Sequence, residues 1–460
     1  MRYGLLITLL FCCFPIVYAS AQESWRIRKI CNWQDSTAVI PNRAGQRYNE
    51  VWGFTMHGKE YAAIGSTMGV HIIDVDLCKE VAFYKGRHQI DVTHRDFKTY
   101  KHYLYAVCDQ GVSTLQVFDL RYLPDSLHLL YESDPYKLML VHNIFIDTGK
   151  GTLYAASARD LLMHYDFMRV YSLDQPDRPE LITKFNLNAT VHDVFVRNDT
   201  AYCSSSLYGF EIVDFSSRDS NWYKFAELKN YAYQGYNHSS WINETGIGVM
   251  ADETHGLPLK VIDTRNLQNI RVLSTFMPRE DTTCIPHNPF LIGNTAYISY
   301  YFDGLQMYDI TDPYHPVRIG YYDTHPGTPW KGFAGAWGCY PFLPSGRILV
   351  SDMQTGLYIF DVSEALGKHQ MPDPAHPQIT IYPDPVQNLL KLYLPDAQPG
   401  PVDWVLYDML GKKVQGGRFI YETGAFQPIR LTLSGSLSPG MYVFTLRNGS
   451  RSFTSRISKL

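Results

Sequence analysis

The chain has 460 residues, a formal net charge of −4 and a charged fraction of 19%. These values exclude the broad basic surface by which proteins bind nucleic acid, and they exclude a long acidic tail. The length allows two or three domains, or one large β-sheet body with an appendage, and an aromatic content of 14% suits half-buried pleated sheets.

The first 21 residues have the pattern of a secretory signal peptide. A short cationic start is followed by an apolar run from Leu5 to Val17 and by the small-residue sequence ASA at positions 19–21. The run is too short to cross a membrane as a helix, and no small residue directly precedes Cys12, so we do not expect a lipoprotein anchor. Because no later stretch is apolar enough to span a membrane, we expect a soluble mature protein beyond the inner membrane.

Residues Trp25–Trp33 (WRIRKICNW) alternate between apolar and polar side chains, which predicts a β-strand. A pattern of four short strands then recurs along the chain, each time from a tryptophan or histidine entry residue. Subtracting the numbers of adjacent entry residues gives steps of 42, 48, 50, 46, 49 and 50 residues, which are typical of propeller blades. The entry residues are Trp52, His94, His142, His192, His238, His287 and Trp337.

The unit from His287 to Asp323 shows the pattern most clearly. Its expected strands are separated by turns at Gly293-Asn294 and Asp303-Gly304, and they are His287–Ile292, Thr295–Tyr301, Leu305–Ile310 and Val317–Tyr322. A single unit would have two uncovered apolar faces, so it must pack between neighbours. We therefore predict an all-β fold with a seven-bladed β-propeller over residues 22–367.

The last unit, from Trp337 to Val362, has only three expected strands. We expect the N-terminal strand, Trp25–Trp33, to supply the fourth, because this pairing closes the ring and removes two exposed sheet edges.

The third strand ends in aspartate in six of the seven units, and the unit that begins at His142 is the exception. We expect these aspartates to cap the following turns through local hydrogen bonds. A catalytic role is disfavoured, because a catalytic residue need not recur in nearly every unit. The six residues are Asp74, Asp119, Asp214, Asp263, Asp309 and Asp361.

Six cysteines follow the predicted signal peptide, and an even number in an exported protein permits disulfides. We expect Cys108 and Cys203, which occupy equivalent strand positions, to be small buried fillers. Cys284 and Cys339 flank the entry positions of adjacent units and are the favoured pair. The remaining two are Cys31 and Cys78.

Residues 368–377 form a polar, proline-rich linker, and the repeat is absent from residues 378–460. We expect turns at Leu410-Gly411-Lys412, Gln415-Gly416-Gly417 and Pro439-Gly440. The pattern predicts a small β-sandwich, with strands Ile379–Tyr382, Leu389–Leu394, Trp404–Tyr407, Ile429–Leu433, Tyr442–Leu446 and Ser452–Ile457.

The aspartate-ending third strands and the His-Asn and Gly-Leu entry signals resemble those of the LVIVD-repeat β-propellers, the choice-of-anchor B family. The resemblance covers roughly Trp25 to Leu366. It implies an architecture and no particular reaction.

Three motifs near the C-terminus resemble the type IX secretion sorting domain of Bacteroidota. They are Tyr382–Pro385 (YPDP), Val405–Val414 (VLYDMLGKKV) and Leu437–Leu446 (LSPGMYVFTL), with Asp384 where the family usually has asparagine. The resemblance implies that residues 378–460 engage the type IX machinery for transport across the outer membrane. It also implies later cleavage, followed by release or attachment to surface polysaccharide.

The five histidine entries are expected to form a partial ring, because the first strand of each blade lines the central channel. The second strands run antiparallel to the first, so Asp109, Asp352 and other acidic residues at their ends lie on the same face. The candidate ligand-binding residues of this face are His94, His142, His192, His238, His287, Asp252, Glu253, Asp303, Trp330 and Trp337.

Three roles are open for this face. One is a divalent metal site, with candidate ligands His142, His192, His238 and His287 and with Asn143, Asp193 and Asn288 orienting the rings. Another is a site for a surface glycan or a protein, to which Tyr233 and Tyr236 would add stacking area. In the third role, each histidine only bonds backbone groups of its own or the next blade.

The sequence nominates no catalytic nucleophile. Ser204-Ser205-Ser206 lacks the Gly-x-Ser-x-Gly elbow, and neither a phosphate-binding glycine loop nor a His-Glu-x-x-His helix occurs. We therefore expect a secreted or surface-attached module that binds a ligand or partner. The alternative is a metal-dependent hydrolase or lyase that uses the histidine face as its active site.

Overall fold

The computed structural model describes residues 24–38, 40, 45–89, 92–217, 219, 221–330, 332–367, 380–382, 386, 388–393, 400–409, 411–421, 429–449 and 451–459. Apart from the short 3₁₀ helix η1 (Leu120–Tyr122), the elements of these residues are β-strands. The predicted all-β class is therefore confirmed. None of the described elements is a helix with the length and apolar character needed to span a membrane. The predicted signal peptide, residues 1–21, and the predicted linker, residues 368–377, lie outside the described residues.

The described residues between 24 and 361 form seven antiparallel sheets, most of which take four consecutive strands in chain order. The first sheet contains β3 (Tyr48–Met56), β4 (Lys59–Ser66), β5 (Gly69–Asp74) and β6 (Lys79–Lys85). The second contains β7 (Arg95–Tyr100), β8 (Tyr103–Cys108), β9 (Gln116–Asp119) and β10 (His128–Glu132). The third contains β11 (Asn143–Asp147), β12 (Thr152–Arg159), β13 (Tyr165–Ser172) and β14 (Glu180–Phe185).

The next two sheets repeat this order. The fourth contains β15 (Asp193–Arg197), β16 (Thr200–Ser205), β17 (Gly209–Asp214) and β18 (Tyr223–Leu228). The fifth contains β19 (Asn237–Ile242), β20 (Ile247–Asp252), β21 (Leu259–Asp263) and β22 (Arg271–Phe276).

The last two sheets each add a strand from the N-terminus. The sixth contains β23 (Pro289–Ile292), β24 (Thr295–Ser299), β25 (Leu305–Asp309), β26 (Val317–Tyr322) and, beside β26, β1 (Ser24–Trp25). The seventh contains β27 (Ala336–Tyr340), β28 (Ile348–Asp352), β29 (Gly356–Asp361) and, beside β29, β2 (Arg28–Trp33). Between β1 and β2, Arg26 has a φ of 57° and Ile27 is buried, so the single strand expected over Trp25–Trp33 is broken into two.

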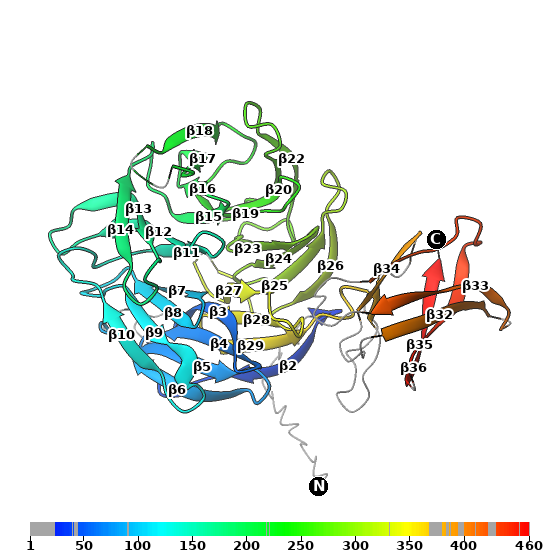
Figure 1. The fold of residues 1–460 in the computed structure, drawn as a ribbon. Coiled ribbons are helices and arrows are strands. Elements are labelled where there is room, and N and C mark those ends of the chain that lie inside the picture. Colours follow the sequence, from blue (N-terminus) through cyan, green and yellow to red (C-terminus); the bar gives the residue numbers. More distant parts are fainter. Residues whose placement is uncertain are drawn as a thin grey trace, which may run out of the picture.

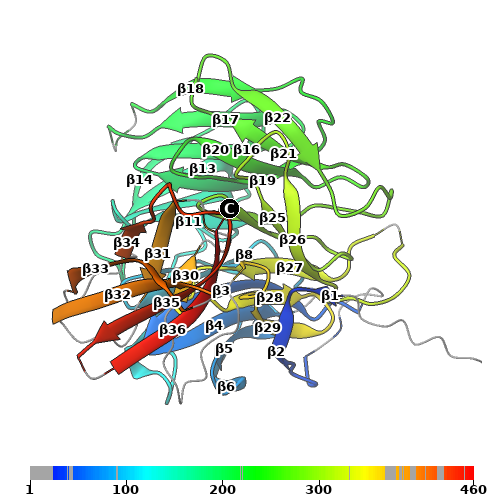
Figure 2. The ribbon, with the colours of Figure 1, turned by 90° about the vertical axis from the view of Figure 1, so that its right-hand side faces the viewer.

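The sheets are arranged around a common centre, with their first strands innermost (Figure 1). These inner strands neighbour one another in the cycle β3-β7-β11-β15-β19-β23-β27-β3. Apolar clusters lie between adjacent sheets, and the first and seventh sheets share one that includes Val51, Ile64, Leu349 and Ile359. Each sheet thus buries both faces against its neighbours, and the arrangement is propeller-like. Figure 2 shows β2 next to its partner β29.

The six recurrent aspartates cap turns, as expected. In each case a side-chain oxygen accepts a hydrogen bond from the backbone N–H two residues later, for example Asp309 from Thr311 at 2.8 Å and Asp361 from Ser363 at 2.9 Å. The other four make the same bond with Asp76, Arg121, Ser216 and Arg265.

The favoured disulfide between Cys284 and Cys339 is wrong, since both thiols are free and buried. Cys284 lies in the apolar cluster between the fifth and sixth sheets, and Cys339 lies in the cluster between the sixth and seventh sheets, so the sixth sheet separates them. The disulfide instead joins Cys31 in β2 to Cys78 after β5, because β2 runs beside the first sheet. Cys108 and Cys203 are free and buried, as expected.

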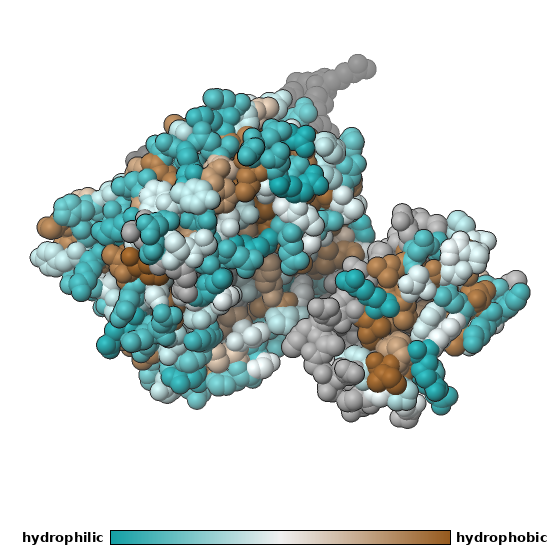
Figure 3. Space-filling model, turned by 45° about the horizontal axis from the view of Figure 1, so that its top comes forward, coloured by the Kyte–Doolittle hydropathy of each residue, from teal (hydrophilic) through white to brown (hydrophobic). Residues whose placement is uncertain are grey.

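The C-terminal residues form two further sheets. One contains β30 (Thr380–Tyr382), β31 (Leu389–Tyr393) and β34 (Ile429–Thr432), and the other contains β32 (Gly400–Asp408), β33 (Lys413–Tyr421), β35 (Gly440–Asn448) and β36 (Arg451–Lys459). A shared apolar core includes Leu390, Trp404 and Phe444. Figure 3 shows hydrophobic residues on the visible face of this sandwich. The exposed apolar side chains of these sheets and their turns include Met409, Ile420 and Met441.

The turn predicted at Gln415-Gly416-Gly417 is wrong, because these residues belong to β33. Gly416 and Gly417 pair with Val405 and Trp404 of β32. A Cβ on Gly417 would lie 2.9 Å from Nε1 of Trp404. The glycine therefore makes room for an indole in the neighbouring strand rather than reversing the chain.

Candidate functional site

Side chains from the inner strands and the residues just before them line the centre of the molecule in three tiers. The middle and lower tiers lie two positions apart on each strand, because residues on one face of a strand recur every second position. The upper tier, the histidine ring, consists of His94, His142, His192, His238, His287 and Trp337. The middle tier carries acid and amide groups: Glu50, Asp96, Asn143, Asp193 and Asn288. The lower tier is largely aromatic and includes Trp52, Lys98, Phe145, Phe195, Trp241 and Phe290.

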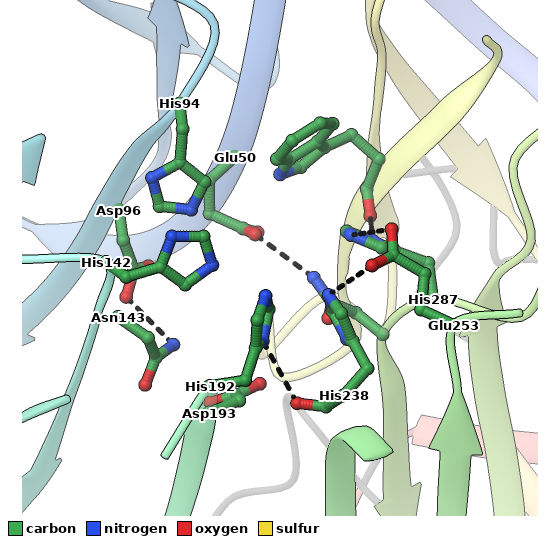
Figure 4. A pocket seen from close by; sticks show the side chains of 12 residues that line it. Glu50, His94, Asp96, His142, Asn143, His192, Asp193, His238, Glu253 and His287 are labelled. Atoms are coloured by element: carbon green, nitrogen blue, oxygen red, sulfur yellow. Dashed lines mark hydrogen bonds and ion pairs between the residues drawn. The ribbon is translucent and has the colours of Figure 1, made fainter. Parts of the chain in front are cut away.

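The aromatic side chains of the histidine ring contact one another in a closed series. Adjacent centroids are 4.1, 4.2, 4.1 and 4.3 Å apart along the series His94, His142, His192, His238, His287. The indole of Trp337 completes the series at 5.0 Å from His287 and 5.7 Å from His94. Together with the middle tier and Glu253, the ring lines a cavity of about 130 Å³ (Figure 4).

Burial keeps most of these imidazoles neutral. It lowers the pKa of His94 to about 4, with help from the neighbouring His142, and it lowers the pKa of His287 to about 3. It also lowers the pKa of His192 and of His238 well below the usual range. His142 differs: burial alone would lower its pKa, but a hydrogen bond to Asp109 and the charge of that carboxylate raise it.

Hydrogen bonds at Nδ1 fix the tautomers of three rings. His142 donates to Oδ2 of Asp109 at 2.7 Å, His192 donates to the carbonyl of His238 at 3.2 Å, and His287 donates to the carbonyl of Trp337. Because these acceptors require a proton on Nδ1, Nε2 carries the lone pair in the neutral rings. Two of the five histidines thus bond backbone groups of the next sheet, as the structural role requires.

The other two rings lack such a bond. Nδ1 of His94 and Nδ1 of His238 are buried without a hydrogen-bond partner. His94 Nδ1 lies 3.8 Å from Asp109, and His238 Nε2 lies 3.8 Å from Glu253. Structural bonding therefore does not account for these two side chains.

Three carboxyl groups around the cavity have raised pKa values. Burial raises the pKa of Glu50 to about 8, with a further rise from Asp96, and it raises that of Asp193 to about 6. Burial also raises the pKa of Glu253 to about 7, against the opposing effect of a hydrogen bond from the hydroxyl of Tyr301 to Oε1 at 2.5 Å. The cavity therefore holds neutral imidazoles next to carboxyl groups that a cation would draw into their charged form.

Asp96 has a structural role in the middle tier. One oxygen accepts from the N–H of Phe97 at 2.7 Å and from Lys98 at 2.8 Å. The other accepts from the N–H of Ile144 at 2.7 Å and from the amide of Asn143 at 3.1 Å. This carboxylate joins the second and third sheets.

Seven of the ten candidate residues named from the sequence line the cavity: the five histidines, Glu253 and Trp337. Asp252 does not line the cavity: it is fully buried and accepts a hydrogen bond from Lys260 at 2.7 Å. Asp303 accepts from Arg279 at 2.5 Å. Trp330 is 46% exposed and packs on Phe302.

Sequence reasoning missed Glu50 and Asp96. Trp52 was aligned with the histidine entries, but it lies in the lower tier, where Lys98 stands 4.5 Å from its ring. Glu50 therefore corresponds to Asp96, and the step between them, 96 − 50, is 46 residues instead of the short first step of 42. That irregular first step was the available signal.

Comparisons with known proteins identify the C-terminal part and the fold. No protein with a curated description matches the chain. The crystal structure of Sqt1 from Chaetomium thermophilum is similar, with a TM-score of 0.50 and 11% identity over 70% of this chain and 96% of that chain, and this likeness concerns the fold alone. Residues 380–459 match the family described as the secretion system C-terminal sorting domain. The protein therefore carries a type IX sorting domain and is secreted or attached to the outer-membrane surface.

Proposed function

We propose that the protein is an extracellular seven-bladed β-propeller of the LVIVD-repeat, choice-of-anchor B type that acts as a binding module. The cyclic order of the inner strands and the pairing of β2 with β29 support closure of the ring by the N-terminal segment. A signal peptide over residues 1–21 would supply the first export step, ahead of the sorting domain.

The observation that carries the binding function is the closed histidine ring over a polar cavity. Repeated packing alone would satisfy each imidazole in the same way, yet the five rings differ in their partners. His238 is only 4% exposed and has no hydrogen bond at Nδ1. A buried polar group without a partner costs about 1–3 kcal/mol, and a ligand beside Nε2, the nitrogen that lies 3.8 Å from Glu253, would give this ring a partner.

The size of the cavity restricts the ligand. Sites for drug-sized molecules usually occupy roughly 300–1,000 Å³, whereas this cavity has about 130 Å³. A glycan chain or a folded protein therefore does not fit inside. The ligand is an ion with its waters, a small polar molecule, or the terminal group of a larger partner that rests on the ring.

A thermal-shift screen tests this function. The panel contains divalent cations, small carboxylates and amines, monosaccharides and soluble cell-surface polysaccharide. A ligand at one hundred times its Kd stabilises the folded state by about 2.7 kcal/mol, so we expect at least one component to raise the Tm of the wild type. The double variant His192→Ala, His287→Ala should lose that shift.

The control is His315→Ala, which makes the same change on a side chain that is 82% exposed. It should keep the shift of the wild type. A panel that leaves the wild type unchanged, or a shift that survives in the double variant, contradicts a ligand site at the histidine ring.

A further inference from the structure

We infer that the histidine ring holds a divalent first-row transition-metal ion, bound by His192, His238 and Glu253. The inference rests on the proposed binding function, because it names the ligand class of the same site. The three side chains come from the fourth and fifth sheets and approach one another on one side of the cavity (Figure 4).

The donor atoms are already close together. One atom from each of the three residues lies within 4.8 Å of the other two. Tetrahedral ligands at about 2.0–2.2 Å from an ion are roughly 3.5 Å apart, so side-chain movements of about 1 Å bring the three atoms to that spacing. The remaining positions of the ion would face the cavity, which has room for water.

His238 points to a ligand independently of this spacing. Its side chain is more than nine-tenths buried, its Nδ1 has no hydrogen-bond partner, and its Nε2 lies 3.8 Å from Oε2 of Glu253. An ion between Nε2 of His238 and Oε2 of Glu253 would give both of these atoms a partner, and the proton of the ring would then lie on Nδ1.

Hydrogen bonds with neighbouring groups orient His192 and Glu253, as is usual for the side chains that bind a metal ion. Nδ1 of His192 donates to the carbonyl of His238, which leaves Nε2 as the free donor. Oε1 of Glu253 accepts from Tyr301, and the backbone N–H of Glu253 donates to the carbonyl of Tyr236 at 2.8 Å. Such second bonds fix the tautomer and direction of a ligand.

The donor set selects the class of ion. Two imidazoles and one carboxylate suit zinc, copper, nickel, cobalt or iron, whereas calcium requires about six to eight oxygen ligands. A second group, His94, Asp109 and His142, also gathers ligand atoms. There the carboxylate already accepts a 2.7 Å hydrogen bond from His142, so an ion would have to break that bond.

Titration of the chelator-treated full-length protein with Co²⁺, followed by its visible absorption bands, tests the inference. We expect one equivalent of Co²⁺ to bind and one equivalent of Zn²⁺ to displace it. His238→Ala should weaken binding by at least roughly tenfold. Glu253→Gln should also weaken the binding of Co²⁺. This variant keeps a side-chain oxygen that accepts the hydrogen bond from Tyr301, so it tests the site even if His238→Ala does not fold.

The matched control is His315→Ala, which makes the same change on an exposed histidine outside the ring and should leave the affinity unchanged. The inference fails if the wild type binds neither ion at millimolar concentration, or if His238→Ala and Glu253→Gln bind the ion as tightly as the wild type does. If both ions fail but a small organic compound stabilises the wild type and not the His192→Ala, His287→Ala variant, the binding module stands without a metal. If every component fails, both proposals fall.

Discussion

Glu50 couples the stability of the channel to pH. Burial, with the neighbouring Asp96, raises its pKa from 4.5 to about 8. Folding therefore takes up a proton between these values, and the stability that the protonated side chain contributes is lost as pH rises through this window. Glu50→Gln stays neutral, so its free energy of unfolding should exceed that of the wild type by on the order of 1–3 kcal/mol at pH 8.

Urea unfolding of the wild type and Glu50→Gln at pH 5 and pH 8 measures this difference. The gap between the two proteins should be small at the lower pH and should open at the higher one. The exposed Glu180→Gln serves as the control for the loss of one carboxylate. Parallel pH profiles for the wild type and Glu50→Gln would show that Glu50 is not the titrating group.

Two aspartates should differ sharply in their contribution to stability. Asp96→Ala leaves Lys98 buried without its partner and leaves the N–H of Ile144 unsatisfied, so we expect a loss of about 3–5 kcal/mol. Asp309→Ala removes a turn cap on Thr311 and should cost about 1 kcal/mol. Chemical denaturation compares the two variants, and equal losses would contradict the structural role of Asp96.

Among single residues, the sequence predicted the cavity-lining side chains that recur at equivalent positions in several units. Histidines at equivalent positions in five units could be aligned, and their convergence on one cavity followed from the geometry of the strands. Glu50 has no such repetition, because only Asp96 and Asp193 share its acidic character within the tier. Asp252 and Asp303 lie at the expected strand ends, but Lys260 and Arg279 determine where their side chains point, and no repeat pattern reveals those partners.

Among the elements, β2 depends on the disulfide between Cys31 and Cys78, which closes a loop with a sequence separation of 47 residues. Replacing both cysteines by serine should lower the free energy of unfolding by about 2–4 kcal/mol. The matched condition is reduction: a reductant should bring the wild type to the stability of the variant and leave the variant unchanged. Equal stability of the oxidised wild type and the variant would contradict a stabilising crosslink.

The strands were largely predictable because turn residues separate them. The expected strand Val317–Tyr322 has the bounds of β26. Glycine was a misleading signal at 416–417, where the space it leaves is filled by Trp404 of a neighbouring strand. Local sequence does not show which side chain approaches a glycine from another part of the chain, so β33 was missed.

At the scale of the whole molecule, export depends on the C-terminal domain. Deletion of residues 380–459, the span that matches the sorting family, should leave the protein in the periplasm of the producing bacterium. Immunoblots of the periplasmic, surface and medium fractions measure this outcome. As the positive control, residues 378–460 fused to a periplasmic carrier should move the carrier outward, and surface display of the deleted protein would contradict the sorting role.

The position of β2 also sets an order of events during synthesis. Arg28 of β2 and its partner Asp361 at the end of β29 are 333 residues apart, so the first strand made in the seventh sheet must wait for the last. The disulfide can form much earlier during export, because both of its cysteines lie near the N-terminus and reach an oxidising compartment before residue 361 does. In an oxidising periplasm the disulfide would thus hold β2 beside the first sheet before β29 has folded. It would also keep the unpaired edge of β2 from pairing with other molecules. In a reducing compartment this disulfide does not form. A larger fraction of the refolding protein should then aggregate than the loss of equilibrium stability alone would indicate.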